Sequence, residues 1–334
     1  MKTLRDLAKK NLTGKVCLLR VDFNVESTKD ALRLEASLPT MKWLLAKGAR
    51  LVILSHRGRP QGIDQKLSLK VFAPFLAKQL KERVEFLKEI PGELAKGRIA
   101  LIENLRFWPE EERDDVKFAH RLASLGDFYV NDAFAVCHRK NSSVTQLPKL
   151  LPSYAGLLLE KEIVTLSAAM KTPKKPLVLI FGGAKVADKL PVIRHLLPKA
   201  GMVLIGSSAL NNVGQLPESE KVLKPIDWVE RDHLAMDIGP LTADLFIQEI
   251  NKAKTIIWNG PVGKFEEKRY LAGSRSLAKA VAASKAFSIV GGGETTQLIL
   301  ELGLRKKIGF LSTGGGAMLE LLAGAKLPGI AVLG

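Results

Sequence analysis

Cysteine is scarce in this chain, and its scarcity excludes two kinds of stabilising site. Cys17 and Cys137 are the only two cysteines among 334 residues, and no CxxC pair is present. A disulfide framework and a cysteine-ligated metal site both need more thiols at closer spacing. No HxxH or HExxH pattern occurs, so a zinc site held by the protein is not expected. Two isolated thiols favour a reducing compartment, and we expect a cytoplasmic protein.

Long apolar runs and aromatic clusters are also missing. No stretch reaches the ~18 uninterrupted apolar residues of a membrane-spanning helix, and no apolar segment follows the basic start at residues 1–6, which disfavours a secretory signal. Aromatic residues make up only 6 % of the chain, without interleaved basic residues, so a dedicated RNA-binding module is disfavoured. We therefore expect no membrane and no specific nucleic acid as a partner.

Positive charge, in contrast, is abundant. Lys and Arg together number 51 against 34 for Asp and Glu, which gives a formal net charge of +17 at pH 7. Such an excess attracts nucleic acids or phosphorylated small molecules. A basic surface without a partner is an equally good interpretation, because the lysines are scattered along the chain. Charge alone does not choose between these interpretations.

Short apolar runs alternate with helical patterns along the whole chain. Candidate strands cover 16–23, 51–55, 99–102, 128–130, 177–181, 203–205, 255–258, 287–290 and 309–311. Apolar residues recur at i, i+3 and i+4 over 69–80, 116–125, 186–197 and 294–302, which indicates helices. Nearly continuous apolar strands separated by helices predict an α/β fold whose mostly parallel sheets are covered on both faces.

A domain boundary is predicted near the middle of the chain. Pro148, Pro152 and Gly156 interrupt the pattern, a helical pattern follows over 157–170, and the proline-rich segment 172–176 precedes a new strand. Prolines and glycines of this kind mark the ends of elements. The sequence therefore predicts a first domain over 1–155, a connecting helix over 156–171 and a second domain over 172–321.

Three glycine-rich turns follow strands of the second half, at 182–183, 291–293 and 314–316. Glycine allows phosphate oxygens to approach the free N–H groups at the start of a helix. A single such turn more often serves packing, but three at the same edge of a parallel sheet predict a nucleotide site. The Walker A pattern is absent, and no GxGxxG follows the first strand, which disfavours P-loop and dinucleotide-binding proteins.

Lys185 and Lys189 follow the first of these turns and are four residues apart. On a helix beginning near Ala184 they would share one face. Cations are unfavourable against the dipole at a helix start. A bound anion would explain this placement, and two solvated lysines are the alternative.

Polar side chains gather where four strands of the first half end. These residues are Arg20, Asp22, Asn24, His56, Arg57, Arg59, Glu103, Asn104, Arg106, Asn131, Asp132, His138 and Arg139, and Arg33 follows the first loop. Converging guanidinium groups repel one another unless an anion binds between them. No GxSxG nucleophile setting is present. Phosphoryl transfer, which needs positioning and positive charge rather than a protein nucleophile, fits these residues best.

Nine segments in order give the chain a resemblance to phosphoglycerate kinase over nearly its whole length. They are RVDFNV (20–25), LSHRGRP (54–60), ENLRF (103–107), NDAF…HR (131–139), GGAKVADK (182–189), DIGP (237–240), WNGPVGKFE (258–266), GGGET (291–295) and STGGGA (312–317). The resemblance implies two Rossmann-like three-layer domains that close around a hinge helix. It implies a glycolytic kinase that is monomeric and binds 3-phosphoglycerate or 1,3-bisphosphoglycerate in domain 1–155. Domain 172–321 would bind Mg²⁺ with ATP or ADP, and residues 322–334 would pack back on the first domain.

The resemblance also assigns roles to individual residues. Substrate binding falls to Asp22, Phe23, Asn24, Arg33, His56, Arg57, Gly58, Arg59, Arg106 and Arg139. Stabilisation of the phosphoryl group in transfer falls to Arg33, Lys185 and Gly315. The nucleotide would contact Gly183, Lys185, Lys189, Asn259, Glu266, Gly292, Gly293, Glu294 and Thr295. Glu294 would also be the metal ligand.

Three departures from the family pattern concern the nucleotide half. Glu294 stands where the family has Asp and reaches about one methylene further towards a metal. Ser207 and Ser208 occupy glycine positions of the segment that lines the adenosine pocket in the family. The chain is also a few dozen residues short, mainly within 212–237. These departures motivate one alternative, a non-catalytic 3-phosphoglycerate-binding protein with a degraded nucleotide site, and the net charge motivates a second, a secondary interaction with nucleic acid.

Overall fold

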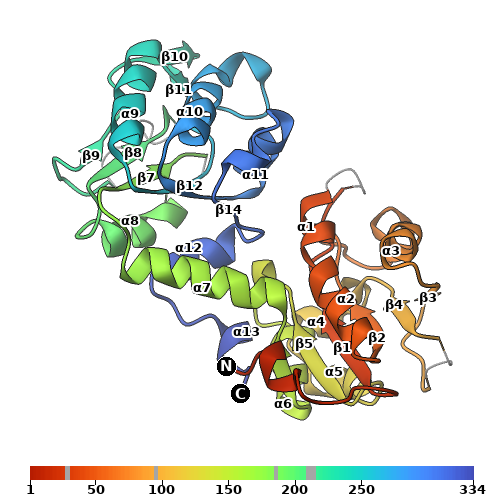
Figure 1. Ribbon diagram of the computed structural model, residues 1–334. Coiled ribbons are helices and arrows are strands. Elements are labelled where there is room, and N and C mark those ends of the chain that lie inside the picture. Colours follow the sequence, from red (N-terminus) through yellow and green to blue (C-terminus); the bar gives the residue numbers. More distant parts are fainter. Residues whose placement is uncertain (27–30, 94–96, 184–186, 208–215) are drawn as a thin grey trace. The chain divides into compact units, whose positions relative to one another are not determined.

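The computed structural model describes residues 1–26, 31–93, 97–183, 187–207 and 216–334. The chain divides into two compact units (Figure 1), one formed by Met1–Ile163 with Lys326–Gly334 and the other by Val164–Ala325. Each unit contains a six-stranded sheet in which every pair of neighbours is parallel. The predicted α/β fold with parallel sheets is confirmed. None of the helices in the described ranges is long and apolar enough to cross a membrane.

The first unit has the strand order β3-β4-β2-β1-β5-β6. Its strands are β1 (Val16–Arg20), β2 (Arg50–Leu54), β3 (Val84–Leu87), β4 (Ile99–Ile102), β5 (Phe128–Asn131) and β6 (Ser153–Ala155). Its α-helices are α1 (Ala31–Ala36), α2 (Leu38–Ala46), α3 (Ala73–Leu80), α4 (Pro109–Glu112), α5 (Val116–Ala123), α6 (Leu147–Leu150) and α13 (Pro328–Ala331), and α7 (Leu157–Lys171) begins in it. Short 3₁₀ helices cover Leu4–Leu7, Gln65–Leu67, Leu69–Phe72, Leu105–Phe107 and Phe134–Val136, and a π-helical turn covers Ser142–Gln146.

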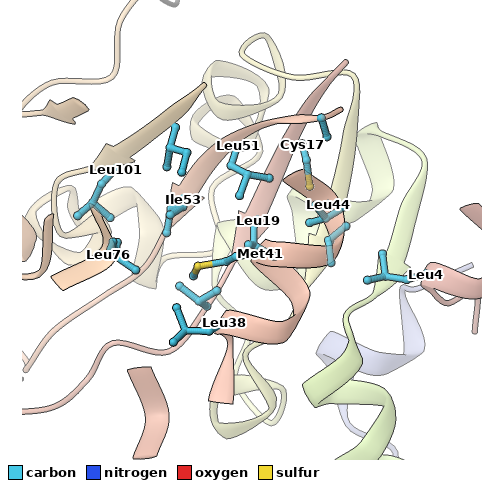
Figure 2. Close-up of a cluster of buried hydrophobic side chains, with 14 of the residues drawn as sticks. Leu4, Cys17, Leu19, Leu38, Met41, Leu44, Leu51, Ile53, Leu76 and Leu101 are labelled. Carbon is cyan, nitrogen blue, oxygen red and sulfur yellow. The ribbon is translucent and has the colours of Figure 1, made fainter. Parts of the chain in front are cut away.

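The core of the first unit lies between its sheet and the helices that cover one face. Figure 2 shows side chains of the central strands, Leu19 and Ile53 among them, facing Met41 and Leu44 of α2 and Leu76 of α3. All five are fully buried, and burying an aliphatic side chain of this size contributes about 1.5–3 kcal/mol. The apolar runs that predict these strands therefore also supply the free energy that holds them in the sheet.

The last residues of the chain complete the first unit. The amide of Gly329 donates to the carbonyl of Cys137 at 2.9 Å, and the amide of Lys2 donates to the carbonyl of Gly334 at 3.1 Å. Asn131, at the end of β5, donates through Nδ2 to the carbonyl of Gly329 at 3.3 Å. Helix α13 is thus held by the same loops that carry polar residues at the sheet edge.

The second unit has the strand order β14-β13-β12-β7-β8-β9, with a separate antiparallel pair β10-β11. Its strands are β7 (Leu177–Phe181), β8 (Met202–Ile205), β9 (Val222–Leu223), β10 (Trp228–Arg231), β11 (Leu234–Ile238), β12 (Thr255–Asn259), β13 (Phe287–Gly291) and β14 (Phe310–Leu311). Its helices are α8 (Leu190–Leu196), α9 (Pro240–Lys252), α10 (Ala272–Ala283), α11 (Gly293–Glu301) and α12 (Gly316–Leu322), with 3₁₀ helices at Ala187–Lys189, Lys268–Tyr270 and Arg305–Lys307. Trp258 of β12 is fully buried at the centre of this core.

Several predicted elements differ from those observed. The strand expected over 16–23 ends at Arg20, and the amide of Asn24 instead donates to Asp22 Oδ1 at 2.9 Å, a local bond that competes with sheet pairing. The helix expected over 69–80 is two elements, Leu69–Phe72 and α3, with a proline in the first turn of α3. Strands β3, β6, β9, β10 and β11 were not predicted. The first four are short or half-exposed, so their apolar pattern is weak. β11 is mostly buried, but Asp237 interrupts its apolar run.

Asp132, which follows β5, caps the start of α7. Its Oδ1 accepts hydrogen bonds from the amides of Leu158 at 2.9 Å and Leu159 at 3.2 Å. These amides have no partner within the helix, because the first four N–H groups of any helix lack one. A Cβ on Gly156 would lie 2.2 Å from Asp132 Oδ1, so the close approach requires glycine. Burial raises the pKa of Asp132 to about 7, against the opposite effect of Thr40 and the two amides.

The variant Asp132→Asn tests this cap through the pH dependence of stability. A carboxyl group whose pKa rises from 3.8 to about 7 on folding stabilises the fold fully below about pH 4 and loses that contribution as the pH rises to about 7. Asparagine keeps an oxygen acceptor and does not ionise. We expect the free energy of unfolding in urea to fall more steeply from pH 4 to 7 for the native chain than for the variant. Parallel profiles would show that Asp132 does not titrate there.

Candidate functional site

The polar residues of the first unit meet at the edge where β1, β2, β4 and β5 end. Asp22 and Asn24 follow β1, and both connect to neighbouring elements. Arg33 Nη1, from α1, lies 3.2 Å from Asp22 Oδ2 and donates to the carbonyl of Asn24 at 3.0 Å. Asn24 Oδ1 accepts a hydrogen bond from the amide of Gly58 at 2.8 Å. The loops after β1 and β2 are therefore fastened to each other, with Asp22, Asn24 and Arg33 brought together as predicted.

His56 is buried at the centre of a group of positive charges. Its Nδ1 lies 3.2 Å from Arg20 Nη2 and 4.0 Å from Asp22 Oδ1. Burial lowers the pKa of His56 well below 6.5, and four positive charges lower it further. These charges are, in decreasing order of effect, those of Arg20, Arg106, Arg33 and Arg139. The imidazole is therefore neutral at pH 7. A guanidinium only donates, so Nδ1 accepts from Arg20 and the ring proton lies on Nε2.

Arg106 and Arg139 extend this basic cluster. Arg106 lies in the 3₁₀ helix capped by Asn104, and its Nε is 3.0 Å from Glu112 Oε1. Burial lowers the pKa of Arg106 to about 10; Glu112 opposes that change, and the charge of Arg139 adds to it. Within the described parts of the chain, the side chains of Arg59 and Arg139 form no ion pair or hydrogen bond. Converging, partly unneutralised guanidinium groups are the arrangement that an anion stabilises.

Two of the residues predicted to bind substrate, Arg57 and Phe23, have side chains that contact other parts of the protein. Arg57 donates from Nε to the carbonyl of Val25 at 3.0 Å and from Nη1 to the carbonyl of Lys66 at 2.9 Å, and it stacks on Phe72 at 5.3 Å. Its guanidinium is thus used to hold the loop after β1. Phe23 is fully buried and its ring lies 5.7 Å from that of Phe72.

Arg20 ends β1 and had no predicted role. Its guanidinium is buried, donates from Nε to Ser143 Oγ at 2.8 Å, and lies 3.9 Å from Glu111 Oε1. Glu111 in turn accepts from the Ser143 amide at 2.9 Å and hydroxyl at 2.6 Å. Burial raises the pKa of Glu111, and Arg20 opposes that change. This buried network positions the guanidinium that contacts His56, and its members are too far apart in the sequence to form a readable motif.

The glycine turns of the second unit lie at the edge where β7, β13 and β14 end. The turn after β7 packs directly on the backbone after β12, because a Cβ on Gly182 would lie 2.0 Å from the carbonyl oxygen of Pro261. The amide of Gly183 donates to that same oxygen at 2.7 Å. The other two turns are neighbours, since a Cβ on Gly315 would lie 3.7 Å from the Cα of Gly292. All three predicted turns therefore share one edge of one sheet.

Asn259 and Lys189 point to a ligand beside these turns. Asn259 ends β12, is buried, and its Nδ2 has no hydrogen-bond partner among the described residues. That Nδ2 lies 3.4 Å from the position of a Cβ on Gly292, next to the start of α11. Lys189 is buried, and its Nζ lies 3.6 Å from the position of a Cβ on Gly183. The buried Nδ2 of Asn259 is a donor without an acceptor among the described residues, which is costly, and a ligand oxygen at this edge would accept its hydrogen bond.

Glu294 lies in the first turn of α11, near a second carboxylate. Partial burial raises its pKa, the charge of Glu266 raises it further, and Lys189 opposes both effects. No group of three or more His, Cys, Asp or Glu side chains that could hold a metal exists in the described ranges. Mg²⁺ takes few ligands from a protein and several from nucleotide phosphates. The single carboxylate of Glu294 beside the glycine turns would therefore fit Mg²⁺ if phosphates bound at these turns. Thr295, in contrast, is buried and its hydroxyl accepts from the amide of Gly260 at 2.9 Å.

Two positions of the predicted nucleotide site, Lys185 and Ser208, lie outside the described residues. Ser207 is buried, and its hydroxyl donates to the carbonyl of Val262 at 2.9 Å. The side chain at this glycine position of the family therefore turns towards the protein backbone.

Comparisons with known proteins agree with this arrangement. The family model of phosphoglycerate kinase matches residues 5–213 and 208–325. The chain belongs to the phosphoglycerate kinase family. It is 40 % identical over 390 aligned residues to the phosphoglycerate kinase of Dictyoglomus turgidum, covering 99 % of this chain and 98 % of that protein. The structure of phosphoglycerate kinase from Pyrococcus horikoshii has 31 % sequence identity and a TM-score of 0.87, covering 100 % of this chain and 98 % of that one.

The chain is a shortened member of the phosphoglycerate kinase family. The phosphoglycerate kinase of Thermomicrobium roseum aligns over 391 residues at 37 % identity, covering 100 % of this chain and 99 % of that protein. Because this chain has 334 residues, more than fifty aligned positions have no counterpart in it. The resemblance inferred from the nine sequence segments is confirmed, as is the shortening.

The variant Glu111→Gln tests the network of Arg20, Glu111 and Ser143 that supports the basic cluster. It removes the carboxylate partner of a buried guanidinium, and breaking a buried ion pair lowers the free energy of unfolding by about 3 kcal/mol. Glu82→Gln is the matched control, because it breaks the partly exposed pair with Arg98 and should change stability by less than about 1 kcal/mol. Urea unfolding measures both. Equal losses would mean that Arg20 is satisfied without Glu111.

Proposed function

We propose that this chain catalyses reversible phosphoryl transfer between the pair 1,3-bisphosphoglycerate and ADP and the pair 3-phosphoglycerate and ATP. The observation that carries the proposal is the cluster of four arginine charges around the neutral His56, at the carboxyl edge of the first sheet. The three adjacent glycine turns of the second sheet support a nucleotide site there. We assign the acid substrate to the first unit and the nucleotide to the second.

The first unit would bind the acid substrate through its phosphate and its hydroxyl. Arg59, Arg106 and Arg139 would hold the phosphate that is not transferred, and the Nε2 proton of His56 would donate to the same group. Asp22, fixed by Arg33 at 3.2 Å, would accept from the hydroxyl. Arg33 would then lie beside the reacting carboxyl end, where its charge stabilises the phosphoryl group in transfer.

The second unit would bind the nucleotide along the glycine turns. The amides of Gly292 and Gly293 at the start of α11, the side-chain amide of Asn259 and the ammonium of Lys189 would contact phosphate oxygens. Glu266 would contact the ribose, and Glu294 would hold Mg²⁺ together with the phosphates. Bound Mg²⁺ would neutralise phosphate charge and orient the γ-phosphate.

Two further residues complete the proposal by the family resemblance. Lys185 would contact the transferred group, and the amides at Gly315 would add partial positive charge at the start of α12. A cytoplasmic, monomeric enzyme whose domains close during turnover stays a prediction, as does the preference for adenine. No observation favours a non-catalytic binding protein over the kinase.

A coupled assay with 3-phosphoglycerate and Mg-ATP, repeated with Mg-GTP, tests the function directly. We expect turnover with Mg-ATP, and turnover with Mg-GTP would show that the pocket near Ser207 does not select adenine. The variant Lys185→Ala should lower kcat at least ~100-fold, the usual effect of losing one electrostatic contact to a transition state. Folded protein that binds 3-phosphoglycerate in calorimetry without turning over would instead favour the non-catalytic alternative.

Two variants should separate the two proposed sites. Arg139→Ala removes a charged contact worth about 1.5–3 kcal/mol, so the KM for 3-phosphoglycerate should rise at least ~10-fold while the KM for Mg-ATP stays unchanged. Asn259→Ala should raise the KM for Mg-ATP and spare that for the acid. Arg113→Ala, at an exposed arginine of the first unit, is the control and should change neither. Equal effects of Arg139→Ala on both constants would contradict the assignment.

A further inference from the structure

The opposite edge of the second sheet carries a row of lysines. Parallel strands all begin at the edge opposite their carboxyl ends, and each of four neighbouring strands of this sheet begins one to three residues after a lysine. Lys174 and Lys175 precede β7, Lys254 precedes β12, Lys285 precedes β13, and Lys306 and Lys307 precede β14. We refer to these six residues as the lysine edge. They lie away from the glycine turns, at the other end of the same strands.

Backbone contacts place these strand starts side by side. The amide of Lys254 donates to the carbonyl of Pro176 at 2.9 Å, and the amide of Phe287 donates to the carbonyl of Lys254 at 3.0 Å. On the far side, a Cβ on Gly309 would lie 2.8 Å from the ring of Phe287. Since neighbouring strands lie about 4.8 Å apart, the strand starts that carry the lysine edge follow one another across four adjacent strands.

The charges of the lysine edge are not neutralised by the protein. All six side chains are exposed, and none forms an ion pair or a hydrogen bond with any residue in the described ranges. The segments that carry them, 172–176, 253–254, 284–286 and 303–309, contain no Asp or Glu. The nearby ion pair of Lys252 with Glu249 at 2.6 Å involves a lysine outside this row.

The first unit provides an internal comparison, because its sheet is also six-stranded and parallel. Three of its strands also begin directly after a basic residue; two of these cations have acidic partners, whereas Arg83, before β3, forms no ion pair in the described ranges. Lys15, before β1, pairs with Asp127 at 2.8 Å, and Arg98, before β4, pairs with Glu82. The dipole of the preceding helix favours cations at this edge in both units. It does not explain why the second unit alone leaves a whole row without acidic partners.

An exposed aromatic ring lies within the lysine edge. Phe287 begins β13 and its side chain is 46 % exposed, beside the backbone of Lys254. Proteins that bind single-stranded nucleic acid combine a row of cations, which follows the phosphates, with aromatic rings on which bases stack. We propose that the lysine edge binds single-stranded nucleic acid without sequence preference. The phosphates would lie along the lysines, and one base would stack on Phe287.

The test compares two variants that lower the net charge equally. The edge variant carries Lys174→Gln, Lys254→Gln, Lys285→Gln and Lys306→Gln. The control variant carries Lys10→Gln, Lys42→Gln, Lys78→Gln and Lys117→Gln, at exposed lysines of the first unit. Fluorescence anisotropy with a labelled oligouridylate of about 20 nucleotides, from about 50 to 200 mM KCl, gives the affinity and its salt dependence.

We expect the native chain to bind with a steep salt dependence. The edge variant should bind at least ~10-fold more weakly at the lowest salt, with a slope of log K against log salt shallower by about 2–3, because each lost phosphate contact removes about 0.7. The control variant should keep the native slope. Lys285→Gln alone should weaken binding measurably in the same direction. Equal losses in the edge and control variants, or no binding by the native chain, would overturn the proposal.

Three further measurements distinguish this surface from other sources of binding. Phe287→Ala should weaken binding to the single strand at least ~5-fold, the low end for losing one stacked base, and leave binding to a DNA duplex unchanged.

Kinase activity of the edge variant should stay native, and Mg-ATP with 3-phosphoglycerate should not displace the oligonucleotide. Displacement by these substrates would place binding at the proposed active site. Binding to vesicles of phosphatidylserine and phosphatidylcholine but not to the oligonucleotide would make the edge a membrane surface. Either result would overturn the proposal.

Discussion

The parallel direction of all the strands in each six-stranded sheet is the constraint on which the rest of the structure depends. Parallel pairing brings the carboxyl ends of all the strands to one edge of the sheet. Residues that are far apart in the sequence therefore become neighbours because of the backbone pairing, and not because their side chains attract one another. In the first unit this edge gathers His56 and the arginines around it, and in the second it gathers the glycine turns. The same constraint puts every strand start at the opposite edge. The two edges of one sheet are thus chemically different because all its strands run in the same direction.

The positive charges gathered at the carboxyl edge of the first sheet are held in place by a buried network. Arg20 is buried and its guanidinium is held by Ser143, with Glu111 at 3.9 Å. This buried carboxylate offsets part of the charge that the arginines bring together. A rigid, hydrogen-bonded support also keeps Nδ1 of His56 as an acceptor, which fixes the proton on the other nitrogen.

The sequence predicted the fold class and the residues at strand ends well, because both depend on local patterns. Apolar runs such as 99–102 and 177–181 coincide with β4 and β7. Side-chain direction was harder to predict. Arg57 and Arg59 are two residues apart in the same loop, yet the first is used in the protein's own hydrogen bonds and the second is exposed. The buried network of Arg20, Glu111 and Ser143 could not be predicted either, since only tertiary packing brings its members together.

The return of Lys326–Gly334 to the first unit has a consequence for the order in which the protein can fold. A ribosome makes the chain from its amino end, so the whole second unit is synthesised before the residues that hydrogen-bond to Cys137 and Lys2 exist. The loop after β5 therefore lacks these partners until the whole second unit has been synthesised. Domains usually fold as units while they emerge. Here the first unit begins to be synthesised before the second, but it can complete its fold only after the second unit has been made.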